Sequence, residues 1–148
     1  MHGAAMQRKV VHVRNVDEYP NSWARLVQQL IDRPGWSQQR LADESGIDRG
    51  TIRRWRTGES VNVAADSVRL IADAAGIDHG IAARAAIGAQ EAANDDEVIR
   101  DVEAATNIDD AYRQEIIEMI HRRRAEAEAA LRRDIELMLR RPPREQAS

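Results

Sequence analysis

The segment SQQRLADESGIDRGTIRRWRTG, residues 37–58, contains two helix start signals and two helix stop signals in succession. Ser37 and Asp48 are good N-caps, because their side-chain oxygens can accept a hydrogen bond from an otherwise free backbone N–H group. Gly46 and Gly58 each stand where a left-handed residue commonly ends a helix. The spacing therefore predicts one helix over about 38–45 and a second over about 49–57, joined by a turn of about three residues.

The residues on either side extend this pattern into a small helical bundle. The same signals predict three further helices: one over about 22–33 capped by Asn21 or Ser22, one capped by Asn62 and ending at Gly76, and one capped by Asp78 and ending at Gly88. No convincing strand pattern accompanies them. Five short helices in this arrangement indicate an all-α fold.

The chain changes character after Gly88. Residues 89–94 are polar and are predicted to form a linker, followed by a short helix over 95–104. A long helix over about 109–140 then runs until Pro142 and Pro143, and its ~31 residues would span roughly 46 Å. The predicted organisation is therefore an N-terminal arm (1–21), a helical domain (22–88), the linker and a C-terminal helical region (95–148).

The charge of the chain is divided unevenly between these regions. The formal net charge is -3, but residues 1–88 hold 12 basic and 10 acidic side chains, against 10 and 15 in residues 89–148. The acidity of the whole chain therefore argues nothing against a nucleic-acid partner for the first region. The absence of cysteine excludes disulfides and thiolate chemistry, and no apolar run is long enough for a membrane span. We expect a cytoplasmic protein, associated with the nucleoid if it binds DNA.

The sequence offers no support for catalysis. The four histidines are scattered, and neither a zinc-protease motif nor a glycine-rich phosphate loop occurs. We therefore expect no enzymatic activity, no cofactor, no metal and no small-molecule ligand.

Two helices joined by a tight turn are typical of a helix-turn-helix, whose second helix can enter the major groove of DNA. The segment SQQRLADESGIDRGTIRRWRTG, followed by VRLIADAAGID, resembles the lambda-repressor and Cro-like (Xre-type) helix-turn-helix DNA-binding family over about residues 22–88. The resemblance implies a five-helix lambda-repressor-like helix-turn-helix bundle, here with a C-terminal helical extension, and double-stranded DNA as its partner.

The resemblance also implies particular contacts. Arg49, Gly50 and Arg53 match positions that typically face base edges, and an arginine there would suit the O6 and N7 atoms of guanine. Gly50 departs from the usual pattern because it has no side chain for base contact. The positions that match phosphate contacts are Gln38, Thr51 and Thr57; Arg54 and Arg56, expected to face outward, are assigned to phosphates as well.

Two further basic stretches are candidates for additional DNA contacts. Arg8, Lys9 and Arg14 could form a minor-groove arm, although basic termini are often idle. Arg122, Arg123 and Arg124 could form a second contact surface, but pairing with the nearby glutamates is the favoured interpretation. The apolar side of the long helix is expected either to fold back on the bundle or the 95–104 helix, or to form a homodimer.

These patterns favour a sequence-specific DNA-binding transcriptional regulator, most simply a repressor of the phage or prophage immunity type. An antitoxin-like autoregulator is the alternative within DNA binding. A helical adaptor that binds only protein is the alternative outside it.

Overall fold

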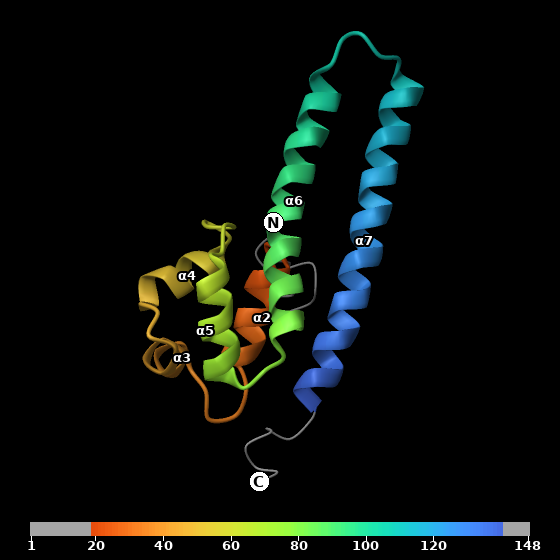
Figure 1. The fold of residues 1–148 in the computed structure, drawn as a ribbon. Coiled ribbons are helices and arrows are strands. Elements are labelled where there is room, and N and C mark those ends of the chain that lie inside the picture. Colours follow the sequence, from red (N-terminus) through yellow and green to blue (C-terminus); the bar gives the residue numbers. More distant parts are fainter. Residues whose placement is uncertain (1–18, 141–148) are drawn as a thin grey trace, which may run out of the picture.

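The structure, a computed structural model, describes residues 19–140 and is helical throughout its regular elements. The helices are α2 (Ser22–Ile31), α3 (Gln38–Ser45), α4 (Arg49–Thr57), α5 (Ala65–Ala75), α6 (His79–Ala104) and α7 (Asp110–Arg140) (Figure 1). No strand occurs among the described residues, so the all-α expectation is confirmed. The predicted arm with Arg8, Lys9 and Arg14 lies outside the described residues.

The ends of α3 and α4 agree with the capping signals in the sequence. The Ser37 hydroxyl accepts a hydrogen bond from the Arg40 N–H at 3.0 Å, and the Asp48 carboxylate accepts one from the Thr51 N–H at 2.7 Å. Gly46 has φ +79°, a left-handed conformation that most residues adopt only with strain. The turn between the two helices therefore forms where the sequence predicts it.

The start of α5 differs from the prediction. Asn62 does not cap this helix; the N-cap is Ala64, and no side chain caps the free N–H groups there. Val63 remains in the preceding loop, where its side chain packs against the hydrophobic core. Packing of a loop residue therefore overrides the local capping signal.

The core of the domain is built around two tryptophans. Trp23 of α2 and Trp55 of α4 meet edge to face, with ring centroids 5.4 Å apart. The fully buried residues of this core come from five helices and include Leu26, Leu41, Ile52, Ile71 and Ala85. This core holds α3 and α4 in a fixed position against α2.

The predicted helix end at Gly88 and the linker over 89–94 are wrong, because α6 continues without interruption to Ala104. Ala89 belongs to the hydrophobic core and Ala92 is also buried, while Glu91 and Asn94 are exposed, so this polar stretch is part of an amphipathic helix. Gly88 serves close packing: a Cβ atom there would lie 2.6 Å from the Ser22 hydroxyl oxygen. That hydroxyl donates a 2.7 Å hydrogen bond to the Ala85 carbonyl.

The long helix α7 folds back on α6 in an antiparallel hairpin. Near the domain, Leu131 and Ile135 join the main hydrophobic core. The outer parts of α6 and α7 extend well beyond the globular domain (Figure 1). Three ion pairs connect the helices along their length: Arg84 with Asp134 at 2.7 Å, Arg123 with Asp95 at 2.7 Å and Arg124 with Asp96 at 2.8 Å. Within the described residues, α7 thus packs on both the bundle and the 95–104 part of α6.

Candidate nucleic-acid interface

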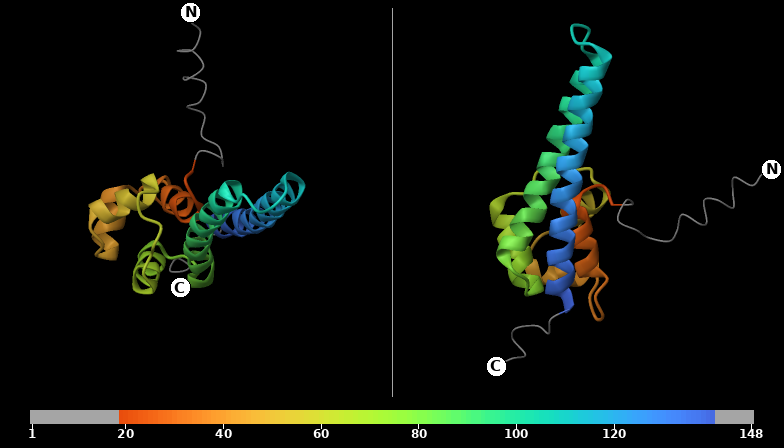
Figure 2. Two further views of the ribbon diagram at one scale, coloured as in Figure 1. Left: turned by 90° about the horizontal axis from the view of Figure 1, so that it is seen from above. Right: turned by 90° about the vertical axis from the view of Figure 1, so that its right-hand side faces the viewer.

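The outward side of α4 is defined by what its other side buries. Ile52 and Trp55 point into the core, and Leu41 and Ala42 of α3 lie against it as well. The side opposite these residues faces away from the bundle. Seen from above in Figure 2, α3 and α4 lie on one side of the molecule and α7 lies on the other.

Arg49 and Arg53 occupy this outward side. They are four residues apart, one helical turn, and both side chains are exposed. Neither makes a hydrogen bond or ion pair with another described residue. Their guanidinium groups therefore keep their full donor capacity for a partner outside the chain.

Gly50 lies between these arginines at a crowded point. A Cβ atom at this position would be 3.3 Å from Asp48 Oδ1 and 3.5 Å from Arg54 Nη1. A side chain there would have to displace a carboxylate or a guanidinium group slightly. Glycine at this position therefore leaves the surface of the first turn of α4 without a projecting side chain.

Arg54 is held along the surface by a chain of hydrogen bonds. The Asp48 carboxylate accepts from the Thr51 N–H and, at 3.1 Å, from the Thr51 hydroxyl. The same hydroxyl oxygen accepts from Arg54 Nη2 at 3.1 Å. The hydrogen bonds from Thr51, with a smaller contribution from the charge of Arg54, hold the pKa of Asp48 below its ordinary value.

Arg56 does not lie outward as the sequence suggested. Its side chain is half-buried, Nε donates to Gln28 Oε1 at 2.8 Å, and Nη1 donates to Gln38 Oε1. Gln28 belongs to α2 and Gln38 to α3. Arg56 therefore ties the recognition helix α4 to both neighbouring helices.

Phosphate oxygens accept hydrogen bonds, so a residue that binds a phosphate needs a free N–H or O–H donor. Gln38, Thr51 and Thr57 differ in whether they have one. Gln38 uses its amide oxygen for Arg56, and its Nε2 donors have no partner among the described residues. The Thr57 hydroxyl donates to the Arg54 carbonyl at 3.2 Å, and the Thr51 hydroxyl donates to Asp48. Gln38 thus has a free donor, whereas both threonine hydroxyl protons are already engaged.

The basic stretch on α7 is not brought together with α4. Arg123 and Arg124 form ion pairs with Asp95 and Asp96 of α6, and Arg122 is exposed. Figure 2 places α7 on the opposite side of the domain from α3 and α4. The favoured expectation from the sequence is that these arginines pair with glutamates of their own helix. Of the three, only Arg124 comes near such a glutamate, Glu128 at 4.0 Å, and its shorter ion pair is with Asp96 of α6.

Sequence reasoning missed the contact of Gln28 with Arg56. The two residues are 28 positions apart, and no local pattern marks a glutamine in the middle of a helix as a partner of a distant arginine. Among the described residues, no group of three or more His, Asp or Glu side chains could hold a metal ion. No helix in this part of the chain is long and apolar enough to cross a bilayer.

The fold and this surface define an all-α domain with a helix-turn-helix. The family model described as helix-turn-helix matches residues 27–81, which include α3, the turn, α4 and α5. No curated protein and no solved structure shows a significant match to the chain. Residues 27–81 are therefore similar to helix-turn-helix domains of the Xre or lambda-repressor type, and this match supports a DNA-binding transcription regulator in general.

Proposed function

We propose that this regulator binds double-stranded DNA sequence-specifically by placing α4 in the major groove, with Arg49 and Arg53 at base edges. The observation that carries the proposal is the state of these two side chains: both are exposed, one turn apart, and without a hydrogen bond or ion pair to any residue that the structure describes. An arginine can donate two parallel hydrogen bonds to guanine O6 and N7. We therefore expect at least one guanine in each half-site.

Gly50 supports a close approach of α4 to the bases. The backbone at this position presents no side chain between Arg49 and Arg53, so the floor of the groove can come nearer to the helix. Base readout then rests on the two arginines.

Phosphate contacts are proposed for Gln38 and Arg54. Gln38 opens α3, and the bond from Arg56 to its amide oxygen leaves Nε2 as the donor for a phosphate. Arg54 is exposed and keeps donors beyond the one that Thr51 accepts. Thr51 and Thr57 would need to exchange an internal hydrogen bond for a phosphate, and Arg56 acts as a brace for α4.

We propose that the protein is a repressor, of the type that maintains immunity in a phage or prophage. Occupation of promoter DNA by this domain excludes polymerase by overlap and requires no activity beyond binding. Fold alone does not assign this role. Transcription from a promoter that contains the selected site, measured with purified polymerase, should fall as the protein is added; a rise would contradict repression.

The DNA proposal is tested by selecting binding sites from random duplex DNA at low salt. The wild-type chain should enrich one sequence, and Arg49→Ala or Arg53→Ala should each relax the preference at one base pair, by ~1–3 kcal/mol. Arg100→Ala is the matched control, because Arg100 is exposed on the outer part of α6. Failure of the wild type to enrich any sequence would contradict the proposal.

A further inference from the structure

The outer side of α7 carries an uncovered apolar stripe. Tyr112, Met119 and Leu137 are 53%, 57% and 52% exposed. Together with Ala130 they lie within about 20° of one another around the helix, because each residue advances about 100°. The residues that α7 buries against α6 and the domain are different ones: Ile117, Ile120, Leu131 and Ile135. Tyr112, Met119 and Leu137 are therefore largely uncovered within the described residues, whereas Ala130 is half-buried.

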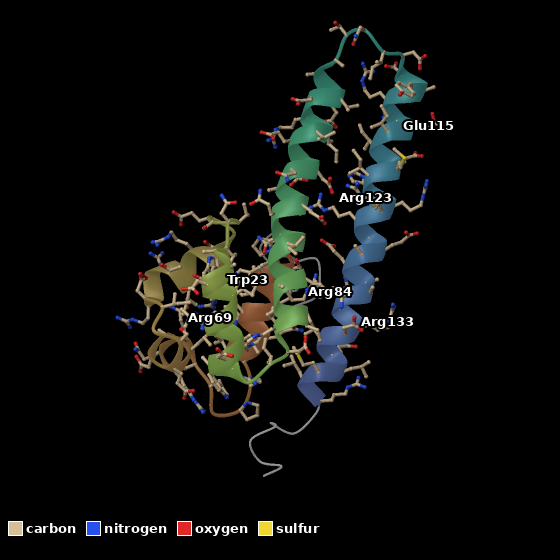
Figure 3. All side chains as sticks on the ribbon, in the orientation of Figure 1. Trp23, Arg69, Arg84, Glu115, Arg123 and Arg133 are labelled. Carbon is tan, nitrogen blue, oxygen red and sulfur yellow. The ribbon has the colours of Figure 1, made fainter. Side chains whose placement is uncertain are left out.

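Four charged residues run beside this stripe in alternating order. Glu115, Arg122, Glu126 and Arg133 are exposed, and none has a hydrogen bond or ion pair with another described residue. Figure 3 shows Glu115 and Arg133 projecting from α7 away from α6. They differ in this from Arg123 and Arg124, whose charges are balanced by α6.

We propose that a second copy of this chain covers the stripe, with the two α7 helices antiparallel about a two-fold axis near residues 124 and 125. With Tyr112 beside Leu137 of the second copy, Met119 falls beside Ala130, since both pairs share the same midpoint. A large side chain thus meets a small one. Because the interface is two-fold, each of these contacts occurs twice.

The charges are complementary in the same register. Glu115 lies beside Arg133 of the second copy, and Arg122 lies beside Glu126, each within half a residue of the apolar midpoint. Along α7 the four charges run acid, base, acid, base, and an antiparallel second copy presents them in the opposite order, base, acid, base, acid, so each charge meets one of opposite sign. A parallel pairing would instead place each charge beside an identical charge, which is repulsive. Charge therefore selects a second copy in the antiparallel orientation.

This pairing leaves the DNA surface open. Figure 2 shows α3 and α4 on the side of the molecule opposite α7. The dimer therefore does not depend on the proposed DNA contacts, and its test measures mass and covalent pairing alone.

The first test is the mass of the full chain in solution by light scattering over a concentration series. The wild type should reach twice the chain mass of 16.7 kDa. Glu115→Arg and Arg133→Glu should each weaken dimerisation about tenfold or more, because two symmetric contacts become repulsive in each variant. The double variant should restore the dimer. Glu97→Arg, an exposed position on α6, is the matched control and should leave the mass unchanged.

The second test uses the absence of cysteine from the chain. Under mild oxidation, Met119→Cys combined with Ala130→Cys should form a disulfide between chains, and neither single variant should. Circular dichroism verifies that each variant remains helical. A wild type that stays monomeric, a charge swap that fails to restore the dimer, or a single Met119→Cys variant that cross-links as readily as the double would overturn the proposal. None of these results would touch DNA binding by α4.

Discussion

Four arginines within about two turns of α4, residues 49–56, have three different environments. Arg49 and Arg53 have no partner within residues 19–140, Arg54 is held by the Thr51 hydroxyl, and Arg56 is hydrogen-bonded to glutamines on two other helices. Net charge is the same for all four. What separates them is the angle at which each leaves α4, because only Arg56 turns back toward α2 and α3.

Arg56→Ala is expected to weaken both stability and DNA binding without changing the preferred sequence. Removal of the guanidinium leaves the amide oxygens of two half-buried glutamines, Gln28 and Gln38, without this donor, at a cost of about 1–2 kcal/mol. The freed Gln38 amide also loses its fixed orientation toward a phosphate. Urea unfolding measures the first effect, and binding to specific and random DNA measures the second. Arg53→Ala is the control: its unfolding midpoint should equal that of the wild type, while its sequence preference changes. A shift of preference in Arg56→Ala would contradict the bracing role.

At the scale of single elements, α4 depends on a cap that titrates. Hydrogen bonds from Thr51 stabilise the ionised form of Asp48, so its pKa in the folded chain lies below the ordinary value of 3.8. A depressed folded pKa means that the cap contributes its stability above the unfolded pKa. That contribution is lost as pH falls through the folded pKa.

Asp48→Asn should remove this pH dependence while keeping a capping side chain. The thermal midpoint of the wild type is expected to exceed that of the variant near neutral pH, and the two should converge below pH 3.8. Thermal melts of both proteins between acidic and neutral pH provide the measurement. A difference that stays constant across this range would count against the titrating cap.

The helix α6 depends on a glycine for packing. Gly88→Ala raises helix propensity by up to ~1 kcal/mol but places a Cβ atom 2.6 Å from the Ser22 hydroxyl oxygen. We expect a net destabilisation of roughly 1–3 kcal/mol, because the core is close-packed at this crossing. Ser22→Ala removes the oxygen, so the double variant should recover part of the loss in urea unfolding. Strictly additive effects of the two changes would show that the crossing is not the cause.

At the scale of the whole molecule, the hairpin of α6 and α7 sets the distance between two DNA-binding domains in the proposed dimer. The 31 residues of α7 span about 46 Å. Antiparallel pairing about the midpoint of α7 places the domains at opposite ends of the paired helices.

The salt dependence of DNA binding should therefore differ between dimer and monomer. The slope of log affinity against log salt scales with the number of phosphates contacted. We expect the wild type to show about twice the slope of Glu115→Arg on a DNA with two half-sites, and an equal slope on a single half-site. Fluorescence anisotropy at several salt concentrations measures both. Equal slopes on the longer DNA would show that the two domains do not bind together.

The ends of α3 and α4, and the exposure of Arg49, Arg53 and Arg54, could be predicted because local signals define them. A cap acts on an N–H group three residues away, and a glycine turn is a property of one residue, so both are visible in a short stretch of sequence. The outward placement of Arg49 and Arg53 follows from the helical angle at which Ile52 and Trp55 turn inward. These features were determined by the sequence itself.

Other features were decided only by the tertiary structure. Gly88 resembles a helix stop, yet α6 continues through it, and the missing side chain leaves the space that the Ser22 hydroxyl occupies. Arg56 resembles an outward charge, yet Gln28 and Gln38 draw it inward from helices distant in sequence. In each case the deciding contact joins residues from different helices. Such contacts depend on how the helices pack, and packing distances are not encoded in any local pattern.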